Sequence, residues 1–172
     1  MSVQYTYCES PIGPLLLSGD GVALSGLHFS TGDKAQEADP QWQRADDAFS
    51  NARQQLTEYF AGTRKEFDLQ LAPRGTEFQL AVWQALAEIP FGETRSYAEI
   101  AERIGRPKAV RAVGSANGNN PIAIVVPCHR VIGSNGSLTG FGGGLPAKKF
   151  LLGLEADNTG LWAQTGPDQP IN

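Results

Sequence analysis

A break in the residue pattern at 73–75, where Pro, Arg and Gly follow one another, constrains the fold of this chain more than any other feature. Before the break, short runs rich in β-branched, aromatic and alternating apolar residues are separated by Pro and Gly, which is typical of strands in a small sheet. After it, apolar residues mostly recur at helical spacing. We therefore predict an α+β protein: a small antiparallel sheet with one helix at 1–72, a mostly helical domain at 76–157, and a loosely ordered tail at 158–172.

The same patterns predict the individual strands. The segments expected to be strands are 3–10, 14–21, 23–29 and 66–71, and a buried strand-like run is expected at 122–126. The first helix is expected to start at Asp46 or Asp47 and to end near Gly62, because the apolar residues between them recur at helical spacing.

The charge of the chain is unevenly distributed. The formal net charge is −4, but residues 95–130 contain six basic and two acidic residues and carry +4, so the remainder carries −8. Such asymmetry indicates one locally basic face on an acidic protein, which suits a nucleic-acid contact of modest electrostatic strength. A solvated helix face that happens to be basic explains the charge equally well.

Soft metal ligands are scarce in this chain. Cys8, Cys128, His28 and His129 show none of the paired spacings of zinc sites, and two cysteines are too few for a disulfide framework. We therefore expect reduced thiols, no metal and no cofactor. The N-terminus lacks a targeting signal and the longest apolar run is too short for a bilayer, so we expect a cytoplasmic protein, or a nuclear one if the source has a nucleus, without a membrane partner. Nothing indicates an obligate protein partner, and we expect a monomer.

Two short helices form a recognisable outline after residue 95. Ser96 and Glu99 make a capping box that opens the first helix, which Gly105 closes. Pro107 suits the first turn of the second helix, which is expected to end at Gly118. Two helices joined by a tight turn are the outline of a DNA-binding helix-turn-helix, although helical hairpins that bind nothing share it.

The run IAIVVPCHRVIG places Cys128 beside His129 and Arg130. A thiolate is the reactive form of cysteine, and a nearby base or positive charge raises its population. Because Pro127 has no N–H for a sheet ladder, we expect the strand to end there. Neighbouring side chains diverge, so a contact between thiol and imidazole relayed by a water is favoured over a direct one. The alternative is a buried, inert cysteine at the end of a core strand.

The combined pattern resembles one family closely. The stretch IVVPCHRVIGSNGSLTGFGGGLPAKKFLLGLE, preceded by TRSYAEIAERIGRPKAVRAVGSANGNNP, is similar to the O6-alkylguanine-DNA alkyltransferases, which are self-inactivating DNA repair proteins. The similarity is strong over 76–155 and loose over the first 71 residues. It implies a ribonuclease H-like first domain and a second domain that binds DNA and accepts the alkyl group. The implied reaction is a stoichiometric, irreversible transfer of the alkyl group from O6-alkylguanine, and also from O4-alkylthymine, in double-stranded DNA.

The resemblance implies a role for each reactive residue. Cys128 would accept the alkyl group, and His129, oriented by Glu155, would act as base through a bridging water. Tyr97 would protonate the guanine ring at N3, so that guanine leaves as a neutral base. Asn120 would brace the turn around the cysteine.

It also implies residues that hold the DNA and the damaged base. Arg111 would fill the space left in the stack by a flipped nucleotide, on a helix lying in the minor groove. The remaining implied DNA contacts are Ala112, Gly114, Ser115, Arg95 and Lys108, and the implied base pocket comprises Tyr97, Cys128, Val131, Phe141, Gly142 and Gly143.

Two other functions compete with this one. A non-enzymatic sensor of alkylated bases on the same scaffold is disfavoured because Cys128 is present. A thiol hydrolase with turnover is disfavoured by the adjacent Cys and His and by the helix-turn-helix outline, which a small-molecule hydrolase does not need.

Overall fold

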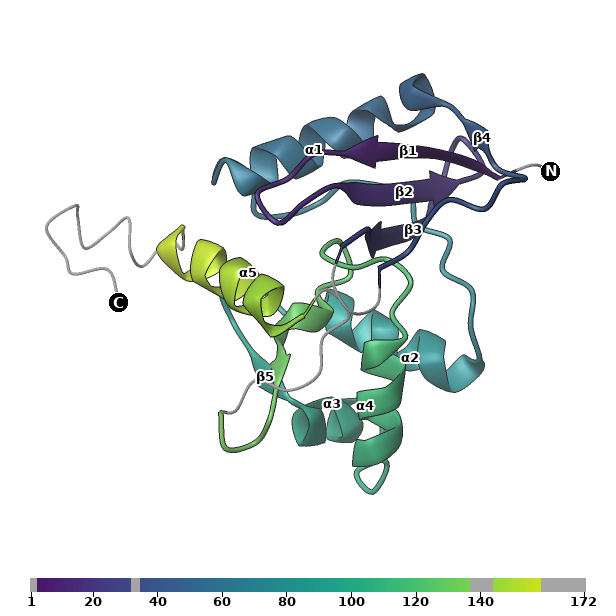
Figure 1. The fold of residues 1–172 in the computed structure, drawn as a ribbon. Helices are drawn as coiled ribbons and strands as arrows, with labels where there is room; N and C mark the ends of the chain where they lie inside the picture. The colour runs from purple at the N-terminus through teal and green to yellow at the C-terminus, as the bar shows by residue number, and fades with distance from the viewer. Residues whose placement is uncertain (1–2, 32–34, 137–143, 159–172) are drawn as a thin grey trace, which may run out of the picture.

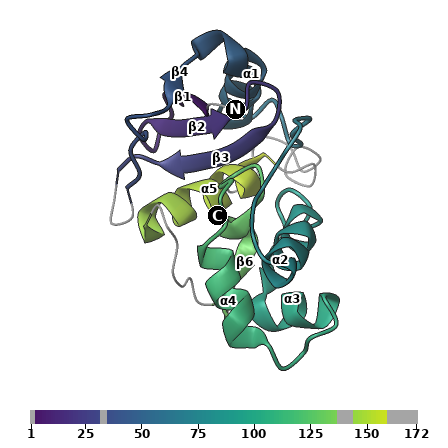
Figure 2. The same ribbon diagram turned by 90° about the vertical axis from the view of Figure 1, so that its right-hand side faces the viewer.

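The computed structural model describes residues 3–31, 35–136 and 144–158. Figure 1 shows a small sheet at the N-terminal end of the chain and a helical part below it, with α5 (Leu145–Asp157) lying between the two. The view in Figure 2, turned by 90°, places α5 in the same position beneath the sheet. The predicted α+β arrangement is therefore confirmed.

The sheet has the strand order β3-β2-β1-β4. Strands β1 (Gln4–Cys8), β2 (Leu15–Gly19) and β3 (Leu24–Phe29) are antiparallel neighbours, as predicted. The fourth strand, β4 (Gln43–Arg44), pairs in parallel with β1, so the sheet is mixed rather than wholly antiparallel. The reason is topological: the chain leaves β3 at one edge of the sheet and returns at the opposite edge, where it runs in the same direction as β1.

One helix covers this sheet. It begins with a 3-10 turn, η1 (Asp46–Phe49), and continues as α1 (Ser50–Phe60), close to the predicted bounds. Its buried side chains, which include Leu56 and Tyr59, recur at helical spacing and face the core.

Residues 66–71 do not form the predicted strand. Their contact with the sheet is a single parallel bridge between Leu24 and Leu71. The side chain of Gln55 accepts a hydrogen bond from the backbone N–H of Asp68 at 2.8 Å and donates one to its carbonyl at 3.0 Å. These are the groups that a strand ladder would use, so the α1 side chain replaces a strand partner.

The predicted strand at 122–126 is also wrong. After one bridge between Leu27 and Ile122 the chain folds into a tight turn, in which the N–H of Val126 donates to the carbonyl of Ile122 at 2.9 Å. Ile124 adopts a left-handed conformation with φ of 71°, which is unfavourable for a β-branched residue. The apolar run correctly predicted burial, but it did not distinguish a buried turn from a buried strand.

The helical part follows the capping signals. Thr76 with Gln79 caps α2 (Glu77–Ala87), and Ser96 with Glu99 caps α3 (Tyr97–Arg103), each as a complete capping box. The second helix of the predicted helix-turn-helix, α4, spans Val110–Gly118 and packs on α2 and α3.

The start of α4 differs from the prediction. Pro107 lies in the turn before the helix, because the N–H of Ala109 donates to the carbonyl of Arg106 at 2.9 Å and closes a separate turn there. One hydrophobic cluster joins the sheet, α1, the helical part and α5, so the two parts of the chain share their core. Among the helices in the described ranges, none is both long and apolar enough to cross a membrane.

Candidate active site

Cys128 lies on a short 3-10 turn, η2 (Cys128–Arg130), directly after the buried turn at 122–126. Its side chain is buried, with 6% of the residue exposed. The side chain of Asn120 accepts a hydrogen bond from the N–H of Ile122 at 3.0 Å and donates one to the carbonyl of Val126 at 2.8 Å. Asn120 therefore holds the two ends of the turn that delivers the cysteine.

The same turn separates Cys128 from His129. Successive residues of a 3-10 helix point about 120° apart, so adjacency in the chain does not bring the two side chains together. The expectation that a strand ends at Pro127 is wrong, because 122–126 is a turn, and Pro127 instead immediately precedes the 3-10 turn. His129 is fully buried, and its Nδ1 atom has no hydrogen-bond partner among the described protein atoms.

The other ring nitrogen of His129 contacts Glu155 on α5, with Nε2 and Oε2 2.7 Å apart. Burial would raise the pKa of Glu155, but hydrogen bonds from His129 and Arg130 outweigh it and lower the pKa to about 2. An ionised carboxylate only accepts hydrogen bonds, so Nε2 must carry the proton and Nδ1 must present its lone pair. Burial also lowers the pKa of His129, against the opposing effect of Glu155, which favours the neutral imidazole.

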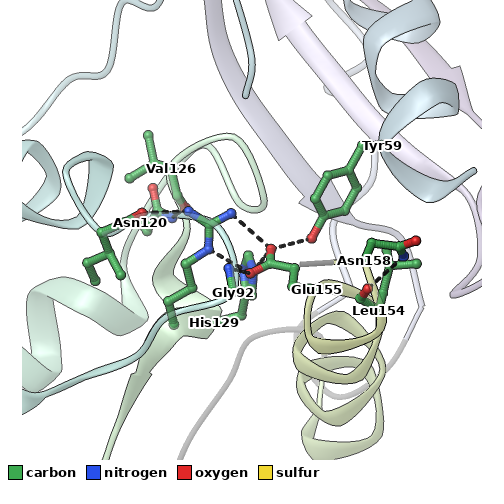
Figure 3. A network of polar contacts seen from close by, with 10 residues as sticks. Tyr59, Gly92, Asn120, Val126, His129, Leu154, Glu155 and Asn158 are labelled. Atoms are coloured by element: carbon green, nitrogen blue, oxygen red, sulfur yellow. Dashed lines mark hydrogen bonds and ion pairs between the residues drawn. The ribbon is translucent and has the colours of Figure 1, made fainter. Parts of the chain in front are cut away.

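Glu155 is the centre of a buried polar network (Figure 3). Arg130 donates to it twice, from Nε to Oε1 at 2.8 Å and from Nη2 to Oε2 at 3.0 Å. Tyr59 of α1 donates its hydroxyl to Oε2 at 2.6 Å. Because three side chains from η2 and α1 contact this one carboxylate of α5, the three segments are fixed relative to one another.

A buried lysine lies on the other side of the cysteine turn. Lys148 of α5 is fully buried, and its Nζ atom donates to the carbonyl oxygen of Val131 at 2.6 Å. Burial raises the pKa of the Cys128 thiol, while a hydrogen bond with Asn120 and the positive charge of Lys148 act in the opposite direction. The thiol is thus protonated at rest, and its environment supports the thiolate once a base removes the proton.

A two-stranded parallel ladder connects Tyr97 with the cysteine turn. Strand β5 (Arg95–Ser96) pairs with β6 (Val131–Ile132), which follows η2 directly. Tyr97 comes next after β5 as the first residue of α3 and is half-buried. A Cβ atom added to Gly114 of α4 would lie 3.9 Å from the Tyr97 ring, so the two helices approach closely at this point.

Helix α4 presents a solvent-facing row beside the site. Arg111, Ala112 and Ser115 are exposed, and the exposed Lys108 precedes the helix. The opposite face is anchored, since Trp83 donates its indole N–H to the carbonyl of Ala116 at 2.9 Å.

Two further side chains relate this row to the rest of the site. Asn117 donates from the buried face of α4 to the carbonyl of Cys128 at 3.5 Å, a long contact that connects the row with the cysteine turn. Arg95 is less available, because it forms an ion pair with Glu93 at 3.0 Å.

The structure thus brings most of the predicted site residues into one region. Cys128, His129, Glu155, Asn120 and Val131 surround the buried turn, and Tyr97 and the α4 row lie next to it. Phe141, Gly142 and Gly143 lie outside the described residues. No cluster of three or more His, Cys, Asp or Glu side chains suited to a metal occurs in the described ranges.

Sequence reasoning missed the structural importance of Tyr59, Asn117 and Lys148. A signal was available for Lys148, which shares the buried stripe of α5 with Leu151 and Glu155. A lysine in such a stripe is unusual, because ammonium groups are rarely buried without a partner. Tyr59 has no comparable local signal, since its partner lies 96 residues away.

Comparison with known proteins agrees with this geometry. Residues 77–157 match the model of the 6-O-methylguanine DNA methyltransferase, DNA binding domain, and residues 3–73 match its ribonuclease-like domain. A Methanosarcina acetivorans protein named methylated-DNA--protein-cysteine methyltransferase is 58% identical over 151 residues, covering 88% of this chain and 97% of the relative. The chain belongs to the 6-O-methylguanine-DNA methyltransferase family.

Other members of the family support the assignment at the level of structure. The Mycobacterium tuberculosis protein of the same name is 54% identical over 153 residues, covering 89% of this chain and 92% of the relative. The crystal structure of Mycobacterium tuberculosis O6-methylguanine methyltransferase aligns with a TM-score of 0.84 at 51% identity, over 97% of this chain and 96% of that one. A structure titled as Mycobacterium tuberculosis OGT in complex with DNA aligns with a TM-score of 0.83 at 52% identity, over 92% and 94% of the two chains.

Proposed function

We propose that this methyltransferase-family chain repairs alkylated DNA by moving the alkyl group from O6 of guanine to Sγ of its own Cys128. The observation that carries the proposal is the contact between His129, which follows Cys128 on the same buried turn, and Glu155 of α5, with Nε2 and Oε2 2.7 Å apart. It supplies a neutral imidazole with a free Nδ1 lone pair on the same turn as the Cys128 thiol. Relatives at more than 50% identity carry the name methylated-DNA--protein-cysteine methyltransferase, and a structural relative is titled as a complex with DNA.

The chemistry is a single displacement at carbon. His129 Nδ1 takes the thiol proton through one bridging water, which also gives this buried nitrogen a hydrogen-bond partner. The Cys128 sulfur then forms a bond to the alkyl carbon as the bond between that carbon and O6 breaks. Tyr97 donates a proton to N3 of the leaving guanine, so that a neutral base departs. The half-buried position of Tyr97 at the end of β5, beside the strand that follows Cys128, supports this role.

The product explains why each molecule acts once. A thioether at Cys128 has no carbonyl or phosphoryl centre for water to attack, and the reaction has no step that regenerates the thiol. Burial of Cys128 further limits access to the sulfur. The protein is thus a reagent consumed in equal amount with the lesion.

Burial of the thiol also requires that the damaged nucleotide leave the duplex. A base in the stack cannot bring O6 to a buried sulfur, so we infer that the nucleotide rotates out of the helix. Arg111 would then occupy the gap, since its side chain is exposed on α4. The small residues Ala112, Gly114 and Ser115 would allow α4 to lie in the minor groove, and Arg95 and Lys108 would contact phosphates.

We infer the base pocket from the family resemblance. Backbone groups of Cys128 and Val131 would read the edge of the flipped base, and Phe141, Gly142 and Gly143 would complete the pocket on the O6 side. A thymine alkylated at O4 carries the reactive carbon on an equivalent exocyclic oxygen and is the second substrate that we propose.

Intact and peptide mass spectrometry tests the proposal. The protein is mixed with a duplex oligonucleotide that bears one O6-methylguanine. One methylene mass should be added per protein, on the Cys128 peptide, in the wild type and in Cys8→Ser but not in Cys128→Ser. Tight lesion binding without any mass gain would instead identify a sensor. Turnover of an ester substrate beyond one equivalent would identify a thiol hydrolase.

A further inference from the structure

Tyr59 is a tyrosine of the N-terminal part that reaches the centre of the acceptor site. It lies on α1, is fully buried, and donates its hydroxyl to Glu155 Oε2 at 2.6 Å. The same oxygen lies 2.7 Å from His129 Nε2, so Tyr59 and His129 share one acceptor atom (Figure 3). No other side chain from residues 3–73 hydrogen-bonds to Glu155 in the described ranges.

The position of this hydroxyl is fixed by aromatic packing. The Tyr59 ring contacts the rings of Phe60, Phe67 and Phe91, with centroid separations of 5.2, 5.4 and 6.2 Å. Arg130 lies over the ring of Phe91, the most distant of these three, with its Cζ atom 5.7 Å from the ring centroid. Burial, reinforced by the Glu155 carboxylate, raises the pKa of Tyr59, so the phenol keeps its proton and acts as a donor at neutral pH.

A second donor changes what Glu155 does to His129. Each hydrogen bond to a carboxylate stabilises its negative charge and reduces its attraction for a further proton. With Tyr59 in place, Oε2 therefore still orients His129 but raises its pKa less, so the imidazole stays neutral. Without the phenol, the same oxygen would favour the imidazolium more, and Nδ1 would be less available as a base.

We propose that Tyr59 is a positioning residue for alkyl transfer, which orients Glu155 and tunes the basicity of His129 from the N-terminal part of the chain. This inference rests on the proposed function, because it needs His129 to act as the base. It also gives residues 3–73 a role in the reaction besides packing.

The other charged groups around the pair do not differ between the variants that test this inference. Arg130 on η2 and Lys148 on α5 both act on His129, and Cys128 lies on the same turn as the imidazole. Lys65 contacts the outer part of this cluster, with Nζ 5.9 Å from the Phe91 centroid.

The test is the pH dependence of single-turnover alkyl transfer by the full chain, from a duplex that carries one O6-methylguanine. In Tyr59→Phe the rate at pH 7 should fall about 3- to 10-fold, the effect of one typical hydrogen bond. The midpoint of the acidic limb should also move to higher pH, because His129 then holds its proton more strongly.

A matched variant separates this effect from a loss of packing. Thr6 is buried in β1 and donates to Asp46 at 2.5 Å, without contact to Glu155. Thr6→Val should reduce the stability of the N-terminal part while leaving the midpoint of the acidic limb of the pH–rate profile unchanged. If Tyr59→Phe does not fold, replacement of Tyr59 alone by 3-fluorotyrosine, a stronger donor, should move the midpoint to lower pH.

The outcomes distinguish the two proposals. A wild-type protein that transfers no alkyl group would refute the proposed function. A wild-type protein that transfers it, together with a Tyr59→Phe or fluorotyrosine variant whose midpoint stays in place, would refute the inference alone. The inference alone would also be refuted if Tyr59→Phe and Thr6→Val lowered the rate equally at every pH, because Tyr59 would then act only through packing.

Discussion

The ammonium group of Lys148 donates a hydrogen bond to the carbonyl oxygen of Val131 at 2.6 Å, and both residues are completely buried. The contact joins α5 to the strand that follows the cysteine turn. It also places a positive charge near Cys128, which lowers the pKa of the thiol and so opposes the increase caused by burial. The reactivity of Cys128 should therefore depend on a residue of α5 as well as on its own turn.

Replacement of Lys148 by Met removes this charge while keeping a long side chain. The pKa of Cys128 should rise further, because a cation stabilises the thiolate and its loss favours the thiol. We expect alkylation of Cys128 by iodoacetamide at pH 7 to slow about tenfold, measured from the Cys128 peptide over a range of pH. Lys149→Met is the control, since Lys149 is exposed. Equal rates in the two variants would show that the buried charge does not act on the thiol.

Glu155 should make the unfolding free energy of the protein decrease at acidic pH. Its pKa is lowered to about 2 in the folded protein, so its contribution is present above the pKa of the unfolded chain and is lost as the pH falls from about 5 to about 2. The contribution is about 3 kcal/mol of unfolding free energy, measured by urea unfolding at several pH values.

Glu155→Gln should reduce stability at pH 7 by about 3–5 kcal/mol, because Arg130 then stays buried without its anion, and should flatten the acidic decline. Glu88→Gln, which removes an exposed ion pair with Arg103, should cost less than about 1 kcal/mol. An acidic decline of the same size in Glu155→Gln and the wild type would assign it to other carboxylates.

Arg111 should matter for duplex DNA and not for the reaction at sulfur. Its side chain is exposed on α4, whereas Cys128 is buried. Arg111→Ala should slow transfer from duplex O6-methylguanine at least tenfold, by analogy with the cost of one lost stacking or phosphate contact. Transfer from free O6-benzylguanine should not change, and both rates follow from the mass of the protein with time.

Arg103→Ala is a suitable comparison for Arg111→Ala, because Arg103 of α3 is already paired with Glu88. A parallel loss in both variants would indicate a general charge effect. A loss of the free-base reaction in Arg111→Ala would show that Arg111 acts inside the pocket.

Asn120 should hold the turn that presents the thiol. Asn120→Ala removes the hydrogen bonds to Ile122 and Val126, while Ile124 stays in its unfavourable conformation. We expect a loss of about 2–3 kcal/mol in unfolding free energy and slower modification of Cys128, measured by urea unfolding and peptide mass. Asn119→Ala, next to it but exposed, should leave both quantities nearly unchanged. Full reactivity of Cys128 in Asn120→Ala would refute this role.

Signals that act within a few residues were sufficient to predict several elements of the fold. The Ser96–Glu99 capping box starts α3 as expected, because both of its hydrogen bonds lie within one helical turn. The antiparallel pairing of the first three strands followed from the short connections between their apolar runs. The reactive motif around Cys128 also lies in one continuous stretch, which is why the sequence by itself determined the family and singled out Cys128 as the proposed nucleophile.

The tertiary structure decided whatever depends on partners remote in the chain. Residues 66–71 do not form a strand because the Gln55 side chain binds the backbone of Asp68, and 122–126 forms a turn held by Asn120. Both segments nevertheless have strand-like sequence patterns. The basicity of His129 and the charge near Cys128 depend on Glu155, Tyr59 and Lys148, which only packing brings together. Electrostatic effects of this kind act between buried groups a few ångströms apart. Residues remote in the sequence reach such distances only in the folded chain.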